Sequence, residues 1–314
     1  MSIIKKGQAV KVVLSFLFAF LILYFFISRA EVGKIINILA NANFLFLFVA
    51  FALFYGVFWA KSMRWKIFLA NIGFKEKLSN ITEIYFLGQF INTLLPARLG
   101  DFYKAHLMKK NFGIAGSRAF GTILFDRLFD LIFMAVLFFI SVFAFFGKNI
   151  PSGIRKSVLL LFLLVFAALA FFIVLSRKKN IMIRLMPKMF KISFKNFQSA
   201  AAKSLNVRTI PIVLFITAIV WVLEFFIFYL ITKSIGLNIS FFLVIIIVVT
   251  ANAVMTIPIT PSGLGLVEAG IAVILMLVGV EKNIAISVAL LNGLINYWNQ
   301  LAFGLLVYII SKRS

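Results

Sequence analysis

The sequence predicts an all-α, polytopic membrane protein. Of its 314 residues, 63% are hydrophobic and only 13% are charged, and 40 are phenylalanines. Apolar runs recur from one end to the other, each close to the roughly 20 residues that an α-helix needs to cross a hydrocarbon core of about 30 Å. We expect about six spanning helices and two broken, re-entrant helical hairpins, all within a single integral membrane domain over residues 1–314.

The first apolar run follows a basic start, a pattern that signal peptides share. Its core, residues 12–28, exceeds the roughly 7 to 15 residues of a signal-peptide core, and no A-x-A site follows it, so we interpret it as a retained helix. The spanning helices are expected near residues 12–28, 44–60, 119–146, 157–175, 210–235 and 284–310.

The stretch "LLPARLGDFYK", residues 94–104, interrupts a helix with Pro96 and Gly100. The arm before it, residues 78–96, is half polar, and the arm after it, residues 99–112, carries too many charges to cross lipid alone. We therefore expect a re-entrant hairpin that returns to its own side of the membrane, with its broken backbone satisfied by neighbouring helices or water.

A second interrupted stretch, "PITPSGLGLVEAG", spans residues 258–270 and joins apolar arms at 240–257 and 264–280. Both arms are apolar enough to cross, so a re-entrant hairpin and a full crossing remain alternatives. The helix-breaking residues expected here are Pro258, Pro261, Gly263 and Gly265. The break repeats the Pro, Leu and Gly spacing of the first one, and an acid follows each: Asp101 in the first, Glu268 in the second.

The basic residues predict the orientation. The formal net charge is +23, and because the basic residues cluster in short loops between apolar runs, we favour a membrane protein over a nucleic-acid-binding one. With both termini in the cytoplasm, most Lys and Arg residues fall on the cytoplasmic side, as the positive-inside rule requires of a protein of the cell membrane. The two hairpins then open toward opposite sides, the arrangement of an inverted repeat.

The longest loop, residues 177–208, is basic and amphipathic. A helix beginning near Pro187 places Phe190, Phe194 and Phe197 on one face and lysines on the other. We expect it to lie on the cytoplasmic leaflet, drawn to anionic headgroups. The alternative is a solvated loop that merely obeys the positive-inside rule.

Several classes of site are disfavoured by composition. The chain has no cysteine and a single histidine, which excludes disulfides and thiolate metal sites and makes a histidine-rich metal centre improbable. There is no G-x-x-x-x-G-K-[ST] nucleotide loop. We expect no metal and no cofactor.

Charged residues inside the apolar segments are the candidate substrate-binding residues, since each costs about 2.5 to 3.5 kcal/mol at the bilayer centre and must pair, protonate or face inward. They are Arg98, Asp101, Asp126, Arg127, Asp130, Glu224 and Glu268. Helical spacing lets Arg127 sit between Asp126 and Asp130. Arg98 is then the better candidate for a free cation, able to bind a phosphate bidentately.

A structural role is the alternative for these charges. Asp126, Arg127 and Asp130 can be buried ion pairs that hold helices together, and Glu224 can form a hydrogen bond between helices. Two stripes of polar residues have a similar pair of interpretations: hydrogen-bonded contacts between helices, or the wall of a polar cavity. One comprises Asn80, Thr82, Glu83, Gln89, Asn92 and Thr93, and the other Asn292, Asn296, Asn299 and Gln300. We favour cavity walls, because both stripes lie near broken helices.

Three motifs in order, "LLPARLGDFYKAHLMKK", "AFGTILFDRLFDLI" and "PITPSGLGLVEAGIAVIL", resemble the lysylphosphatidylglycerol synthase transmembrane-region family, also called flippase-like domain proteins. The likeness covers about residues 10–310. In the bacterial multiple peptide resistance factors of that family, this membrane domain is fused to a cytoplasmic aminoacyl-transfer domain and flips aminoacylated phosphatidylglycerol. Within these 314 residues we expect no transferase domain, so the resemblance does not imply a lysyltransferase.

The resemblance implies a flippase for a phospholipid or lipid-linked headgroup, with Arg98 and Asp101 in the first motif, Asp126, Arg127 and Asp130 in the second, and Glu268 in the third. The expected partners are an anionic phospholipid or lipid-linked substrate, the membrane and a separate transferase, but no nucleic acid. One rival is a non-transporting membrane partner of a lipid aminoacyl- or glycosyl-transferase. The other, an intramembrane lipid-phosphate enzyme, lacks any nucleophile and base pair in the sequence.

Overall fold

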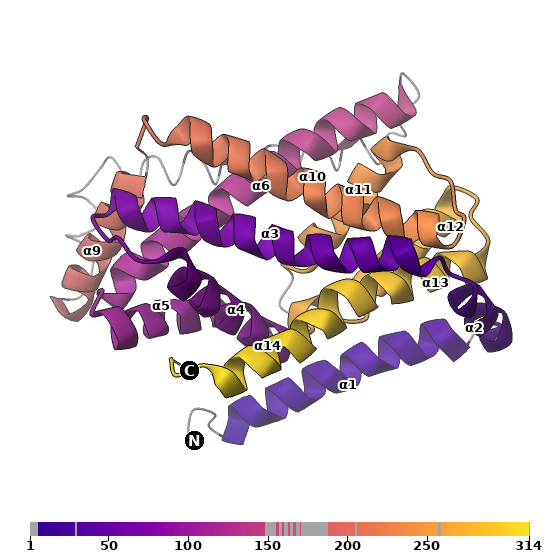
Figure 1. The fold of residues 1–314 in the computed structure, drawn as a ribbon, viewed down its shortest axis with the longest axis horizontal. Helices are drawn as coiled ribbons and strands as arrows, with labels where there is room; N and C mark the ends of the chain where they lie inside the picture. The colour runs from indigo at the N-terminus through magenta and orange to yellow at the C-terminus, as the bar shows by residue number, and fades with distance from the viewer. Residues whose placement is uncertain are drawn as a thin grey trace. The chain divides into compact units, whose positions relative to one another are not determined.

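The computed structural model describes residues 6–28, 30–147, 188–204, 206–256 and 259–313, together with isolated positions between 155 and 170. Every regular element in these residues is a helix (Figure 1). This confirms the all-α membrane class. The expected span at 157–175 and the helix-breaking Pro258 lie outside the described residues, apart from the isolated positions.

The chain folds as two compact units, each assembled from discontinuous segments. The first unit contains Met1–Gly56, Leu87–Gly100 and Leu223–Ile310, and the second contains Val57–Phe86, Asp101–Val222 and Ser311–Ser314. The long helices α3 (Phe44–Asn71) and α10 (Ile210–Ser234) therefore contribute residues to both units. The single membrane domain expected over residues 1–314 stays a prediction.

The first unit begins with α1 (Lys6–Ser28), α2 (Val32–Ala40) and the first half of α3. Its C-terminal part consists of α11 (Phe241–Val254), the 3-10 turn η1 (Pro261–Gly263), α12 (Leu266–Leu277), α13 (Lys282–Gly293), the π-helical turn η2 (Leu294–Trp298) and α14 (Asn299–Ile310). Helix α12 packs against α11, α13 and α1. Ala19, Leu264 and Tyr297 form a buried cluster where α1 meets the second helix break.

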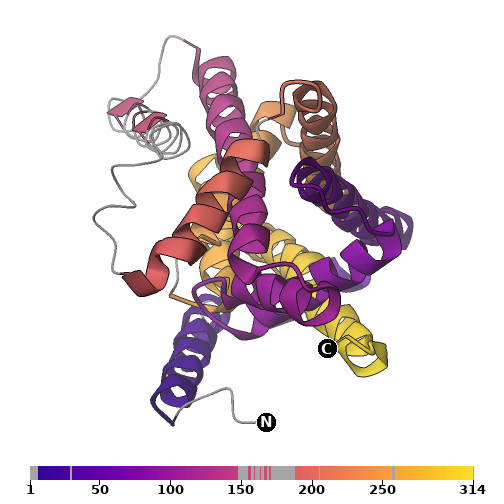
Figure 2. The same cartoon turned by 90° about the vertical axis from the view of Figure 1, so that its left-hand side faces the viewer.

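The second unit holds the end of α3, most of α5 (Leu99–Phe112), α6 (Gly116–Phe146) and the start of α10. Helix α9 (Lys188–Ser204) crosses α6 (Figure 2). The contact is close at Gly121, where a Cβ would lie 2.9 Å from the carbonyl oxygen of Phe197. Phe68, Phe125 and Val213 belong to the buried core beside it.

Helix α9 confirms the helix expected within residues 177–208. Its inner side is buried at Gln198, Ala200 and Ala201, whereas Lys195 is exposed. This inner side packs on α6, so in the described residues α9 buries part of its apolar surface against protein rather than offering all of it to lipid. Its place on the cytoplasmic leaflet stays a prediction.

Four described helices are long and apolar enough to cross a membrane, namely Phe44–Asn71, Gly116–Phe146, Ile210–Ser234 and the continuous stretch Lys282–Ile310. Three shorter apolar helices accompany them: Val12–Phe25, Phe241–Val254 and Pro261–Leu277. The span expected at residues 44–60 ended too early. Helix α3 continues to Asn71, because Trp65, Phe68 and Leu69 are buried and hold this turn against the core.

Candidate functional site

The first helix break separates α4 (Leu78–Leu94) from α5 by four residues. Ala97 and Arg98 have φ angles of 62° and 53°, the left-handed region that costs non-glycine residues energy. The side chain of Asn92 accepts a hydrogen bond from the backbone N–H of Gly100 at 2.7 Å. One N–H group at the start of α5 is thereby satisfied within the hairpin, as the sequence required of any broken helix in lipid.

Gly100 allows the two arms of this hairpin to touch. A Cβ at this position would overlap the carbonyl oxygen of Gly88 and lie 2.7 Å from Oδ1 of Asn92. The role expected for Gly100 as a helix-break residue therefore has a physical basis: only a residue without a side chain permits this approach.

The second break ends at Gly265, where α12 begins. The backbone N–H of Gly265 donates to Oε2 of Glu268 at 2.7 Å, the reciprocal half of a capping box. Glu268 is 7% exposed, and Gly293 of α13 leaves room for it, since a Cβ there would lie 2.7 Å from Oε1. Gly265 itself has a φ of 81° and packs against the backbone of Ala19.

The two breaks meet in the first unit. Ser262, at the centre of the second break with a φ of 45°, donates from its hydroxyl to the backbone carbonyl of Asn92 at 3.1 Å. Ala97, Arg98 and Ser262 are the non-glycine residues with positive φ among those the structure describes. All three lie in the helix breaks, so backbone strain is concentrated where the hairpins touch, as is common at functional sites.

Residues of the last helix form hydrogen bonds with the first hairpin next to this contact. The hydroxyl of Tyr297, in the π-helical turn, donates to the carbonyl of Thr93 at 3.0 Å. Nε2 of Gln300 donates to Oγ1 of Thr93 at 2.5 Å and to the carbonyl of Gln89 at 2.9 Å. A π-helical turn within an α-helix is itself frequent at functional sites.

These contacts correct one expectation. The two polar stripes were expected to line a cavity, but at Gln89, Thr93 and Gln300 they bond to each other. Asn296 instead bonds within its own helix, to Asn292. An unpaired amide or hydroxyl in an apolar interior is costly, so facing polar side chains pair where the helices come close enough.

Substitutions of Glu268 test whether its negative charge, or only its hydrogen-bonding oxygen, stabilises the protein at the start of α12. We expect Glu268→Ala to destabilise the protein by about 0.5 to 2 kcal/mol, the usual loss of a helix cap. Glu268→Gln keeps an oxygen that can accept the Gly265 N–H and should lose less. Thermal unfolding in detergent compares the two variants. Equal losses in both would mean that the carboxylate does more than cap the helix.

The second unit holds a buried cluster of charges. Arg64 of α3, which is 0% exposed, donates from Nε to Asp126 at 2.6 Å and from Nη1 to Asp130 at 2.7 Å. Nη1 also donates to the hydroxyl of Thr217 on α10 at 3.1 Å. One guanidinium thus joins α3, α6 and α10.

A second group of charges in this unit surrounds Asp101. Arg127 approaches both oxygens of Asp101, with Nη2–Oδ1 at 3.2 Å and Nε–Oδ2 at 3.3 Å. Lys104, 1% exposed, lies 2.8 Å from Oδ1 and places its Nζ over the rings of Tyr85 (4.6 Å to the centroid) and Trp65 (5.6 Å). With the Arg64 group, three cations balance three carboxylates, the neutral arrangement that a buried cluster requires.

Two polar atoms of this cluster are buried without a hydrogen-bond partner among the described residues. They are Nη2 of Arg64 and the hydroxyl of Tyr85, whose side chains are 0% exposed. Buried donors of this kind are uncommon in proteins, and each is a potential contact for a polar ligand. No group of three or more His, Cys, Asp or Glu residues suited to a metal ion occurs within the described residues.

The structure therefore brings together four of the expected site residues, Asp101, Asp126, Arg127 and Asp130, but pairs them differently. The cation between Asp126 and Asp130 is Arg64, not Arg127, which instead pairs with Asp101. The spacing argument failed because a cation on its own helix competes poorly with one that reaches both carboxylates from a facing helix.

The other three expected residues, Arg98, Glu224 and Glu268, belong to the first unit. Arg98 is half-buried and does interact with another group, so the expectation that it is a free cation is wrong. Glu224 also has an interaction partner. Their contact with a substrate stays a prediction.

Arg64, Lys104 and Tyr85 are the cluster residues that sequence reasoning missed. Arg64 fell outside the expected spans and Lys104 within the charged second arm of the first hairpin, and both were counted among the cytoplasmic basic residues. A signal was available for Arg64, because "YGVFWAKSMRWKIFLAN" keeps an apolar residue on one helix face through Phe68 and Leu69. A continuing helix would have carried Arg64 into the interior.

Comparison with known proteins identifies the family. Residues 10–304 match the family described as "Lysylphosphatidylglycerol synthase TM region". A UPF0104 membrane protein of Methanocaldococcus jannaschii is 32% identical over 229 residues, which cover 72% of this chain and 95% of that protein. A UPF0104 membrane protein of Pyrococcus horikoshii is 26% identical over 316 residues, covering 90% of this chain and 92% of its own.

A further relative is larger. The glycosyltransferase AglD of Haloferax volcanii is 31% identical over 106 residues, which make up 33% of this chain and 17% of that protein. The family match, by contrast, extends over nearly the whole chain and agrees with its apolar helices. This chain belongs to the lysylphosphatidylglycerol synthase transmembrane-region family and is a multi-pass membrane protein.

Proposed function

We propose that this protein is a flippase that moves a phospholipid or a lipid-linked headgroup between the leaflets of the cell membrane. The observation that carries the proposal is the hydrogen bond between Ser262 and the Asn92 carbonyl. It joins the tips of two broken helical hairpins inside one apolar unit. Discontinuous helices that meet in this way supply polar backbone at membrane depth, where continuous helices supply none.

In this proposal the acyl chains stay in the bilayer while the headgroup passes the helix breaks. Arg98 binds the lipid phosphate, because a guanidinium offers two parallel N–H donors to phosphate oxygens and α5 begins directly after it. Thr260 is a second candidate contact, since its hydroxyl is buried in the second break without a hydrogen-bond partner among the described residues.

The acids have supporting roles. Asp101 holds Arg127 and Lys104, and Asp126 and Asp130 hold Arg64, so that the cluster of the second unit is charge-balanced before substrate arrives. Glu224 and Glu268 remain proposed substrate contacts for a cationic headgroup. The sequence has no nucleotide-binding loop, so movement runs downhill or is coupled to an ion gradient. Both termini lie in the cytoplasm in this proposal, and the hairpins open to opposite sides.

The test is lipid translocation in proteoliposomes, followed by dithionite quenching of fluorescent phosphatidylglycerol. We expect the wild-type protein to raise the quenched fraction above that of protein-free vesicles, and Arg98→Ala to abolish the gain. Arg98→Lys, which keeps the charge but not the bidentate fork, should retain part of it. Residue 98 has a left-handed φ, and alanine and lysine both keep the Cβ that arginine has there. The backbone strain at this position is therefore the same in the wild type and in both variants.

Arg118→Ala removes an exposed arginine at the start of α6 and is the matched control. It should translocate like the wild type. Full activity of Arg98→Ala would contradict the role given to Arg98. If wild-type protein fails to move phosphatidylglycerol, a zwitterionic lipid and a polyprenyl phosphate alike, the flippase proposal fails as a whole.

The second candidate function is a non-transporting membrane partner of a separate glycosyl- or aminoacyl-transferase. The similarity to glycosyltransferase AglD favours it, because the matching stretch is a small part of a protein named for group transfer. A chain in this role would anchor or position the transferase. Failed translocation together with dispensability of Arg98 in cells would favour it. We do not propose catalysis by this chain itself.

A further inference from the structure

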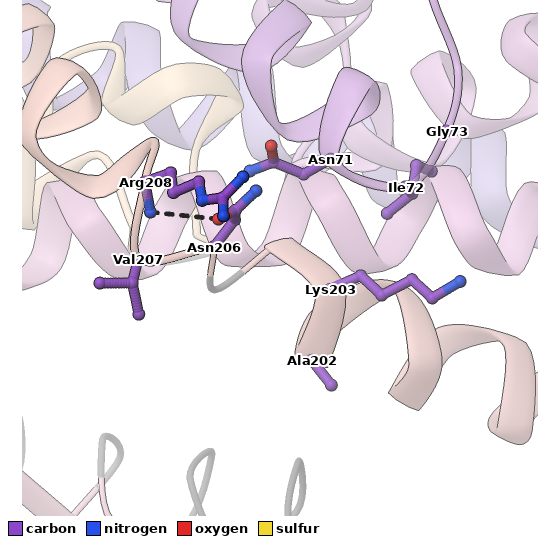
Figure 3. A pocket seen from close by; sticks show the side chains of 8 residues that line it. All are labelled: Asn71, Ile72, Gly73, Ala202, Lys203, Asn206, Val207 and Arg208. Carbon is purple, nitrogen blue, oxygen red and sulfur yellow. Dashed lines mark hydrogen bonds between the residues drawn. The ribbon is translucent and has the colours of Figure 1, made fainter.

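A groove of about 620 Å³ opens on the second unit, and no residue of the charge cluster lines it. One wall is the end of α3 and the turn after it, at Asn71, Ile72 and Gly73 (Figure 3). The other wall is the end of α9 and its connection to α10. That wall is lined by Ala202, Lys203, Asn206, Val207 and Arg208.

The position of the groove along the spanning helices determines the depth in the membrane at which a ligand would bind. Helix α3 ends at Asn71 and α10 begins at Ile210, and both are candidate membrane spans. Where two spanning helices end, the surrounding medium changes from acyl chains to headgroups. A groove formed where these two helices end is therefore expected at headgroup level.

The groove is positively charged and its wall is held in place. Lys203 and Arg208 both line it, and none of its eight lining residues is acidic. Figure 3 shows the Arg208 side chain extending toward Asn71 on the facing wall, while Lys203 extends from the end of α9. Asn71 donates to Oγ1 of Thr209 at 2.8 Å and to the carbonyl of Ser204 at 3.3 Å, which fixes α3 to the α9–α10 connection.

An exposed apolar side chain lies between these cations in the sequence. Val207, which lines the groove, is 80% exposed. Such side chains are costly in water but favourable just beneath a headgroup layer, where basic side chains reach the phosphates above them. The combination favours a lipid over a water-soluble anion, which would gain nothing from them.

We propose that this groove binds the phosphate headgroup of an anionic phospholipid, as a site separate from the transport path. The volume suits a single headgroup, since ligand sites are usually about 300 to 1,000 Å³. Lys203 and Arg208, both on the wall formed by the end of α9 and its connection to α10, contact the phosphate. The bound lipid bridges α3 and the α9–α10 connection, so that lipid composition stabilises this end of the second unit.

Because the chain has no native cysteine, one introduced cysteine reports on this site alone. We would replace Ile72, a partly exposed residue in the groove, with cysteine and measure its alkylation rate in neutral detergent. Added phosphatidylglycerol should slow alkylation at least fivefold, whereas phosphatidylcholine with the same acyl chains should slow it less than twofold. A cysteine at Ile192, outside the groove, should not be protected by either lipid.

Two pairs of variants that remove the same charge distinguish a specific lipid site from diffuse electrostatic attraction between the protein surface and anionic lipid. Lys203→Gln with Arg208→Gln should abolish protection of the cysteine at position 72. Lys75→Gln with Lys77→Gln removes the same charge from exposed positions in the adjacent loop and should leave protection intact. Equal loss in both pairs would overturn the proposal, as would equal protection by the two lipids. Protection by glycerol phosphate at the same concentration as the lipid would overturn the assignment to a lipid.

The outcome is independent of the proposed flippase role. Arg98→Ala should leave protection at position 72 unchanged, because Arg98 belongs to the other unit. A protein that protects the cysteine but moves no lipid would keep the headgroup site and lose the flippase. A protein that moves lipid but does not protect the cysteine would keep the flippase and lose the headgroup site.

Discussion

Replacing Arg64 with methionine is expected to lower the free energy of unfolding by about 3 to 5 kcal/mol, the usual cost of removing one partner from a buried ion pair. Arg64 is fully buried and supplies the cation for both Asp126 and Asp130. Without it, two carboxylates on the same face of α6 are left close together in an apolar interior. Thermal or denaturant unfolding in detergent measures the loss.

The loss should come from the stranded carboxylates rather than from the missing side chain. We therefore expect Asp126→Asn and Asp130→Asn, added to Arg64→Met, to recover most of the stability, because a neutral cluster has little charge left to bury. Lys66→Met, two residues further along α3 and only half-buried, is the matched control and should change the unfolding temperature little. A triple variant no more stable than Arg64→Met alone would refute this explanation.

The second large effect is expected at Gly100. Substituting alanine places a methyl group onto the carbonyl oxygen of Gly88 and 2.8 Å from Cγ of Asn92. Both obstacles are held by the hairpin itself: one is backbone, and the other bonds to the Gly100 N–H. We expect a destabilisation of about 3 kcal/mol or more, at the upper end for overpacking a filled site.

The same change should also impair any function of the first helix break, because the arms of the hairpin must separate to accept the methyl group. Gly270→Ala in α12 is the control, since a Cβ there meets nothing within 4 Å. It should be neutral or slightly stabilising, as alanine is the better helix former. Unfolding in detergent and yield from the membrane fraction distinguish the two variants. Equal tolerance of both would show that the arms are not in contact at Gly100.

The sequence indicates the importance of these two residues to different degrees. Gly100 lies in a helix break that Pro96 already indicates, so its role can be predicted from the sequence. Arg64 stands in a run of basic residues that also fits a cytoplasmic loop. Charge counting treats every lysine and arginine alike, and only packing separates the buried one from its exposed neighbours.

The sequence by itself determined the all-helical membrane class, most of the helices and both helix breaks. Each of these follows from local rules: apolar length, proline and glycine chemistry, and the cost of a charge in lipid. It also identified Asp126, Arg127 and Asp130 as one group and Asp101 as a charge inside an apolar segment, because carboxylates and guanidinium groups in apolar helices must find partners.

Only the tertiary structure decided which partners they find. Arg64 and Asp126 are 62 residues apart, and Ser262 bonds to a carbonyl 170 residues away. Helical spacing governs neighbours three or four residues apart and contains no information about which helix faces which. Pairing across helices depends on how close their backbones pack, which at Gly100 and Gly293 is set by the absence of a side chain.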